Sequence, residues 1–325
     1  MADANNNIGI AGIASNTLLM TISDNGSGNS LDDQWEIALG IGFAENNGAD
    51  VINCSWYISV VSSSVIGNAI NDALDDGRDG LGCVFVFGAG NFNEDEVLFP
   101  ANSYPDLITV GAINQKGMRK TPSSWDGEDT WGSNYGDDLD VVAPGVLIPT
   151  LDLTGSYGYN PNDPLHENAN GTLVSSDYMD DDYTIQFNGT SSATPHVSGV
   201  AALILSANNG LSHDEVEDII ELTANKINPT TYTYSSKTGR NNGNWNKYMG
   251  YGLVDAGAAV ESAVCDHTIE NTRYSSDITI SGCSNVDMEN IIVEDDAILT
   301  IEDVGSILIS GTFEAEIGTQ LVFDP

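Results

Sequence analysis

The sequence predicts an α/β fold built on a parallel sheet with helices on both faces, followed by a small all-β module. Between residues 17 and 260, short apolar runs rich in Val, Ile and Leu alternate with helical patterns, as parallel strands joined by helices do. After about residue 264 the pattern changes to short strands separated by Gly, Asp or Asn. We therefore expect two domains, residues 1–264 and residues 265–325, the second a solenoid- or sandwich-like tail.

The strands and helices of the first domain follow from the same two periodicities. Ser212 and Glu215 have the spacing of a capping box, which marks the start of the last helix expected there. The expected strands are Thr17–Ile22, Val51–Ser55, Val84–Phe87, Leu107–Gly111 and Leu139–Val142, and the expected helices are Asp32–Asn47, Ser64–Asp76, Ser191–Ala207 and Ser212–Ala224.

Two further regions are read from composition. The stretch from Leu151 to Asp182 is rich in Asn, Asp, Gly and Tyr and is interpreted as a solvated surface loop, with calcium binding through Asp177 and Asp180 to Asp182 as the less favoured alternative. In the tail we expect the strands Ile278–Ile280, Ile291–Val293, Ile298–Ile301, Ile307–Ile309, Phe313–Glu316 and Leu321–Phe323.

Charge limits the classes of partner. The chain has 9 Lys and Arg against 48 Asp and Glu, a formal net charge of −39, which repels nucleic acid and anionic lipid. An acidic, solvated surface of this kind suits a secreted protein, with cation binding as the less favoured reading. No apolar run approaches the roughly 20 residues of a membrane span, and residues 1–7 lack the basic and apolar regions of a signal peptide.

The four cysteines fall into two pairs of different character. Cys54 and Cys83 lie within apolar strands, where a free buried thiol behaves as a small hydrophobic group. Cys265 and Cys283 flank a strand-like segment near the start of the tail. We expect a disulfide between them if the protein is extracellular.

The run from Phe187 to Gly199, FNGTSSATPHVSG, has the form of a serine nucleophile at the start of a buried helix. A Gly-Thr-Ser turn would present the Ser191 hydroxyl, and Pro195 is tolerated in a first helical turn, where N–H groups lack intrahelical partners. The free N–H groups and the helix dipole could stabilise an oxyanion beside Ser191. Taken alone, the tripeptide is more often a plain turn or helix cap.

Six segments in one order resemble those of the subtilisin-like serine peptidases, over roughly residues 4 to 264. They are Val51–Ser55, Val84–Asn91, Phe99–Ala112, Tyr135–Gly145, Gly189–Gly199 and Gly250–Ala256. The resemblance implies a serine endopeptidase that acts through an acyl-enzyme on extended protein or peptide substrates in the extracellular space. A related class, the carboxyl-serine peptidases, has an Asp where this chain has Asn91, which argues against it.

The resemblance also assigns roles to residues. Ser191 would be the nucleophile, and the Asn91 side-chain amide with the Ser191 N–H would form the oxyanion hole. The peptide would lie as an added strand between Gly26-Ser27-Gly28 and Ser55-Trp56-Tyr57, close to the strand end Gly88-Ala89-Gly90. The bulk of Trp56 and Tyr57, in place of a stretch that usually contains glycine, could narrow the pocket nearest the scissile bond. Asn6 would be a ligand in a structural calcium loop formed by residues 4–10.

The family's catalytic Asp and His precede the segment that Ala4 to Ile10 resembles, so the resemblance implies that both are absent. None of the four histidines is a good replacement. His196 lies about 140° around the helix from Ser191, and the others are surface positions: His166, His213 and His267. We expect an N-terminally truncated peptidase that is inactive alone and lacks its first strands. The alternative is a secreted protein that binds peptides or glycans without cleaving them.

Overall fold

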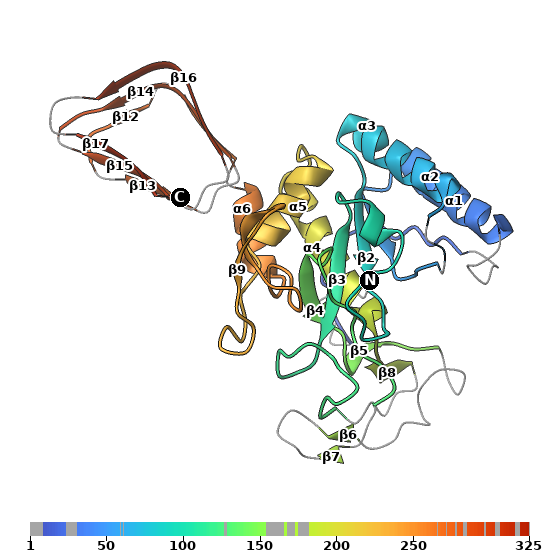
Figure 1. Cartoon of the computed structure of the whole chain (residues 1–325). Coiled ribbons are helices and arrows are strands. Elements are labelled where there is room, and N and C mark those ends of the chain that lie inside the picture. Colours follow the sequence, from blue (N-terminus) through green and yellow to red (C-terminus); the bar gives the residue numbers. More distant parts are fainter. Residues whose placement is uncertain are drawn as a thin grey trace. The chain divides into compact units, whose positions relative to one another are not determined.

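The structure is a computed structural model (Figure 1). It describes residues 9–23, 31–58, 60, 62–126, 129–153, 166–167, 173–174, 182–264, 266–270, 272–276, 278–281, 285–295, 297–302, 306–315 and 319–324. The chain forms two compact units, residues 1–203 with 210–254 and residues 204–209 with 255–325. The division into domains at residue 264 stays a prediction.

Four parallel strands form the central sheet of the first unit, in the order β1 (Val51–Cys54), β2 (Val84–Gly88), β3 (Ile108–Ile113) and β4 (Val141–Pro144). Every residue of β3 and all but the last of β2 are buried, because both faces of these strands are covered. The predicted α/β fold is confirmed. The predicted strands lie within one or two residues of β1 to β4.

Helices flank this sheet, and Figure 1 shows α1 and α2 side by side to one side of it and α4 with α5 to the other. The predicted capping box is present, since Ser212 accepts a hydrogen bond from the N–H of Glu215 and the Glu215 carboxylate accepts one from the N–H of Ser212. The helices are α1 (Leu31–Asn46), α2 (Ser64–Asp75), the short α3 (Gly77–Gly80), a 3-10 turn at Ala101–Ser103, α4 (Thr190–Ala207), α5 (His213–Leu222) and, in the second unit, α6 (Ala256–Val264). None of the helices that the structure describes has the length and apolar character needed to cross a membrane.

The strand predicted at Thr17–Ile22 is wrong. These residues are irregular, and the side chains of Leu18 and Leu19 are 99% and 66% exposed. A strand forms only where a neighbour satisfies its backbone groups, and no described segment pairs with this one. Composition alone therefore does not make this segment a strand.

The remaining pairs in the first unit are short and antiparallel: β5 (Ile148–Leu151) with β8 (Tyr183–Phe187), β6 (His166–Glu167) with β7 (Leu173–Val174), and β9 (Ser235–Lys237) with β10 (Arg240–Trp245). The β6–β7 pair lies inside the predicted polar loop. Of the calcium ligands considered for that loop, Asp177, Asp180 and Asp181 lie outside the described residues.

The tail is built from parallel strands. Asp266 pairs with Asn285, and Asn285 pairs in turn with Ser306, so successive coils stack with a repeat of roughly 20 residues. This stacking agrees with the solenoid and not with the sandwich. Its strands are β11 (Asp266–Glu270), β12 (Arg273–Tyr274), β13 (Ile278–Ser281), β14 (Asn285–Val293), β15 (Ile298–Glu302), β16 (Ser306–Ala315) and β17 (Gln320–Asp324), and they enclose Val286, Met288, Ile291, Val293, Ala297, Leu299 and Ile301.

Cys54 and Cys83 are free and buried, as predicted. Burial raises the pKa of the Cys54 thiol, and it raises that of Cys83 to about 11. Both thiols are therefore protonated at neutral pH and are poor nucleophiles. Cys265 and Cys283 lie outside the described residues, so the disulfide stays a prediction.

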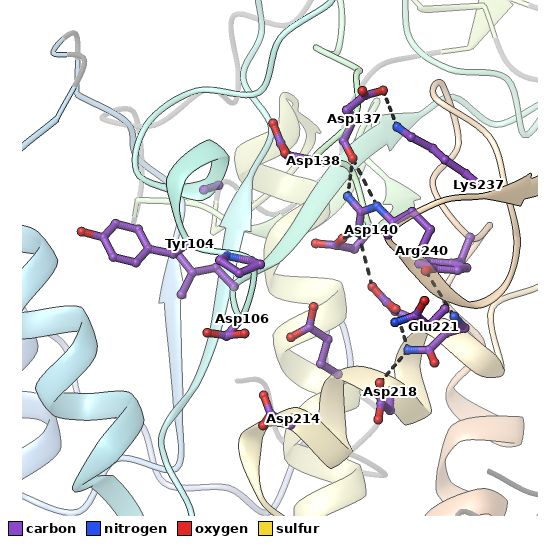
Figure 2. A pocket seen from close by; sticks show the side chains of 18 of the residues that line it. Tyr104, Asp106, Asp137, Asp138, Asp140, Asp214, Asp218, Glu221, Lys237 and Arg240 are labelled. Carbon is purple, nitrogen blue, oxygen red and sulfur yellow. Dashed lines mark hydrogen bonds and ion pairs between the residues drawn. The ribbon is translucent and has the colours of Figure 1, made fainter.

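A cavity of about 720 Å³ between α5, β10 and the loop before β4 is lined by acidic side chains (Figure 2). Asp140 accepts hydrogen bonds from the N–H of Thr109 at 2.6 Å and from Arg240 at 2.5 Å. One carboxylate oxygen from each of Asp140, Glu217 and Glu221 lies within 4.8 Å of the others. Arg240, the first residue of β10, also lies with its guanidinium 3.9 Å from the carboxylate of Glu221 in α5. Its charge therefore links β10 and α5 to Asp140, directly before β4.

These carboxyl groups hold protons more tightly than usual. Burial raises the pKa of Asp140 and Glu217, and burial followed by the charge of Asp140 raises that of Glu221 to about 9. Because the pKa of Glu221 is higher in the folded state than its ordinary 4.5, its contribution to stability is fully present below about pH 4.5. That contribution is lost as the pH rises through about 9.

We therefore expect Glu221→Gln to flatten the fall in stability between pH 5 and pH 9, because the amide replaces a protonated carboxyl. Relative to the variant, the wild type should lose on the order of a few kcal/mol of unfolding free energy over that range, measured by urea denaturation at each pH. Glu261→Gln, at an exposed position of α6, removes the same charge elsewhere and should follow the wild type. Parallel curves for wild type and Glu221→Gln would contradict the assignment.

Candidate active site

The start of α4 places Ser191 at the carboxyl end of the central sheet. Gly189 has a φ of +108°, a conformation that favours glycine, and its carbonyl accepts hydrogen bonds from the N–H groups of Ser192 and Ala193. Its own N–H donates to the carbonyl of Gly145, directly after β4. The turn before α4 is thus fixed to the sheet, and Ser191 follows in the first helical turn.

Ser191 and Ser55 form a reciprocal pair. The Ser55 hydroxyl donates to the carbonyl of Ser191 at 3.0 Å, and the Ser191 hydroxyl donates to the carbonyl of Ser55 at 3.3 Å. The second distance is longer than that of a strong O–H···O bond, so the Ser191 hydroxyl is held weakly. Within the described part of the chain, the N–H of Ser191 makes no hydrogen bond, as expected of a donor in the first turn of a helix.

Pro195 lies deeper in the helix than the sequence suggested. Because α4 begins at Thr190, Pro195 is past the first turn, and its missing N–H leaves the carbonyl of Ser191 without the usual donor four residues on. The Ser55 hydroxyl supplies a hydrogen bond to that carbonyl from outside the helix.

Asn91 follows β2 and is held against the start of α4. Its side-chain oxygen accepts hydrogen bonds from the N–H of Thr190 at 2.8 Å and from the Thr190 hydroxyl at 3.0 Å. Both bonds use the oxygen, so the Nδ2 group keeps its donors, and no described residue accepts from it. Close contact with α4 depends on Gly88, where a Cβ would stand 3.1 Å from the hydroxyls of Thr190 and Thr194.

Asn134 fixes the loop after Asn91 and was missed by sequence reasoning. This fully buried side chain accepts hydrogen bonds from the N–H groups of Phe92 and Glu94 at 2.8 and 3.2 Å, and it donates to the carbonyl of Glu96 at 2.9 Å. A buried Asn that satisfies three backbone groups of another segment gives no local sequence pattern. Only its place before the turn at Tyr135 and Gly136 could have drawn attention to it.

The substrate-binding residues predicted from the resemblance are partly described. Ser55 contacts Ser191, Trp56 packs edge-on against Phe87 at 5.2 Å between ring centroids, and Tyr57, 40% exposed, packs edge-on against the exposed Phe92 at 5.5 Å. Gly88 is the last residue of β2, and Ala89 and Gly90 lead from it to Asn91, with the Ala89 side chain fully buried. Gly26, Ser27 and Gly28 lie outside the described residues, as does Asn6.

The histidines with described side chains are engaged elsewhere. Nδ1 of His196 lies 2.8 Å from the carbonyl of Ser192 in its own helix, as expected of a packed helix residue. Nδ1 of His213 lies 3.2 Å from the carboxylate of Asp214 at the start of α5. The side chains of His166 and His267 are not among those described. No described histidine is therefore placed to accept a proton from Ser191.

The acidic cavity is the one described place where three carboxylates come within a metal's reach of each other. Its chemistry does not fit a resident calcium ion, which takes six to eight oxygen ligands. Asp140 is already occupied by Arg240 and by the N–H of Thr109. The Arg240 guanidinium already neutralises part of this cluster, 2.5 Å from the Asp140 carboxylate and 3.9 Å from that of Glu221.

Comparison with known proteins agrees with this geometry. The family model described as "Subtilase family" matches residues 1–252. The chain is 35% identical over 285 residues to a "Calcium-dependent protease" of Trichormus variabilis, covering 81% of this chain and 39% of that protein. It is 32% identical over 265 residues to "Subtilisin" of Bacillus pumilus, covering 80% of this chain and 74% of that protein.

Among solved structures, the "Proteases from Pseudoalteromonas arctica PAMC 21717" share 32% identity, with a TM-score of 0.47 over 70% of this chain and 58% of that one. The chain spans 39% of the length of the calcium-dependent protease and 54% of "Subtilisin E" of Bacillus subtilis. The family model and the 32% identity with the subtilisin of Bacillus pumilus lead to one conclusion: the chain belongs to the subtilase family of serine peptidases.

Proposed function

We propose that this chain is the nucleophile-bearing part of a serine endopeptidase that cleaves extended protein substrates in the extracellular space. The observation that carries the proposal is the meeting of Ser191 with two uncommitted donors, its own N–H and Nδ2 of Asn91. Membership of the subtilase family and the acidic surface support it.

The chemistry would follow from these groups. The Ser191 oxygen attacks the carbonyl carbon of the scissile peptide bond, and the two donors stabilise the negative charge that develops on the carbonyl oxygen. Collapse of the tetrahedral intermediate breaks the C–N bond, releases the amine with a proton from the base and leaves an acyl-enzyme, which water then hydrolyses. Each of these steps needs a general base that takes the proton of Ser191 and returns it.

We propose that the base and the group that orients it belong to polypeptide outside these 325 residues. Among the described residues, β1 pairs with β2 alone, so one edge of β1 is open. A parallel strand added there would end near Ser55, because the carboxyl ends of parallel strands meet at one edge of a sheet. Its last residues would therefore lie close to Ser191.

Two described segments carry rows of exposed apolar side chains. Leu31, Trp35, Leu39 and Phe43 recur every four residues along α1, and each is more than half exposed. Leu18, Leu19, Met20 and Ile22 are exposed on the segment that was predicted as a strand. An apolar surface of this extent is costly in water and marks a face that another segment covers. Without that segment we expect the chain to be inactive or nearly so.

Expression of the chain alone and within its complete open reading frame tests the proposal. We expect a fluorophosphonate probe to label Ser191 in the complete form at least about a hundredfold faster than in the isolated chain, because a positioned base contributes roughly 10²- to 10⁴-fold. Ser191→Ala should remove all labelling, as read by intact-protein mass spectrometry. A folded, complete protein that is not labelled would overturn the proposal and leave binding of peptides or glycans without cleavage.

The oxyanion role of Asn91 gives a second prediction. Asn91→Leu keeps the approximate size of the side chain and removes the amide donor, so kcat of the complete form on a peptide substrate should fall about 10²- to 10³-fold with KM little changed. That magnitude comes from the loss of one such donor in subtilisin, a relative of this chain. Asn47→Leu, at an exposed position after α1, should leave kcat unchanged. An equal fall in both variants would refute the role.

A structural calcium ion is the proposed cofactor, supported by the relatives named calcium-dependent proteases. The proposed ligand is Asn6, within the loop of residues 4–10, and the acidic cavity takes no part. Saturating calcium should raise the melting temperature of the complete protein by several degrees, since a bound ion stabilises only the folded state. Asn6→Ala should remove that increment in differential scanning calorimetry and Glu217→Gln should keep it; the reverse pattern would move the site to the cavity.

A further inference from the structure

The Ser191 carbonyl has an unusual set of partners. Pro195 deprives it of its helical hydrogen bond, and the Ser55 hydroxyl donates to it instead, at 3.0 Å. The same carbonyl belongs to the residue whose hydroxyl would attack the substrate. Whatever orients the Ser55 hydroxyl therefore helps to set the position of Ser191.

Asn53 orients Ser55. Its Nδ2 donates to the Ser55 hydroxyl oxygen at 3.0 Å, so that this hydroxyl keeps its own proton for the carbonyl of Ser191. The side-chain oxygen of Asn53 accepts a hydrogen bond from the Ser198 hydroxyl at 2.9 Å. Both contacts fix the direction of the Asn53 amide, because its donor end faces an oxygen that needs a donor.

These bonds close a ring between β1 and α4. It runs from Ser198 to Asn53, on to Ser55 and then to Ser191, which returns to Ser198 through two turns of α4. Ser198 donates to Asn53, Asn53 donates to Ser55 and Ser55 donates to the carbonyl of Ser191, and the backbone of α4 closes the ring. The ring holds the backbone of Ser191, whereas the Ser191 hydroxyl has only its long contact of 3.3 Å to the carbonyl of Ser55. The nucleophile would thus have a fixed backbone and a hydroxyl free to turn.

We propose that Asn53 and Ser198 are positioning residues for Ser191, acting through the Ser55 hydroxyl in place of the helical hydrogen bond that Pro195 removes. The inference rests on the proposed function, in which Ser191 is the nucleophile. Neither residue touches the reacting atoms. Their effect is to hold the Ser191 carbonyl, and with it the first turn of α4, against the end of β1.

The test uses the complete protein and two measurements. The first is the second-order rate constant for labelling of Ser191 by a fluorophosphonate, and the second is the 15N chemical shift of the Ser192 amide, which reports hydrogen bonding to the Ser191 carbonyl. Asn53→Asp removes the donor to Ser55 and should slow labelling roughly threefold to tenfold, the range that the loss of one hydrogen bond supports. It should also shift the Ser192 resonance.

Matched variants separate this role from a general effect. Asn47→Asp makes the same change at an exposed Asn whose Nδ2 bonds the carbonyl of Phe43, and it should behave as wild type in both measurements. Ser198→Ala should lower the labelling rate about twofold to threefold, and Ser198→Thr, which keeps the hydroxyl, should restore it. Pro195→Ala returns an N–H to the helix, so Asn53→Asp should have a smaller effect in that background.

Each outcome is decisive. If Asn53→Asp and Asn47→Asp match in labelling rate and in the Ser192 shift, the positioning role is overturned. If Pro195→Ala leaves the effect of Asn53→Asp at full size, the link to the missing helical bond is overturned. A wild-type protein that is not labelled at all counts against the proposed function, and the Ser192 shift then decides alone whether the ring acts on Ser191.

Discussion

The two hydrogen bonds from Thr190 to the side-chain oxygen of Asn91 are the contacts on which the site depends, because they join segments 99 residues apart in the chain. They use both acceptor positions of the amide oxygen and so determine where the amide nitrogen points. A donor that is already oriented costs no reorganisation when negative charge develops beside it. Gly88 supports this contact because its missing side chain lets β2 lie close to α4. Asn134 supports it by holding the loop after Asn91 through hydrogen bonds to Phe92 and Glu96.

The two edges of the central sheet differ in completeness. At β4, the sheet continues into ordered structure, where Val142 bridges to Leu253 and the chain around Tyr251 bonds to the carbonyl of Asp140. At β1, no described strand pairs with the outer backbone edge. The groups proposed for oxyanion binding come from the start of α4 and from the loop after β2, the strand next to β1, and the proton acceptor is assigned to a segment beyond the open edge of β1. Under the proposed function, the described residues hold the nucleophile and the oxyanion donors, and the segment that covers this edge supplies the base.

Much of the fold was predictable because its strands and helices have strong local patterns. The four sheet strands are short, mostly apolar runs, and the capping box of Ser212 and Glu215 marks the start of α5. The strand predicted at Thr17–Ile22 was wrong because composition indicates only a tendency to form a strand, whereas a strand forms only when a neighbour pairs with it. Sequence pointed to Ser191 and Asn91 through their motifs. It could not show that Asn134 holds the loop after Asn91 or that Ser198 bonds Asn53, since these contacts join residues at least 38 apart in the chain through single side chains.

The tail differs from the first unit in the range of its strand pairing. Each coil of its solenoid pairs only with the coil before and the coil after it, as β14 does with β11 and β16. Stability in such a stack is approximately a sum over neighbouring coils. A tail of this kind can gain or lose whole coils without altering those that remain. The number of coils is therefore open to change by duplication, whereas the sheet strands and α4 of the first unit are tied to residues far along the chain.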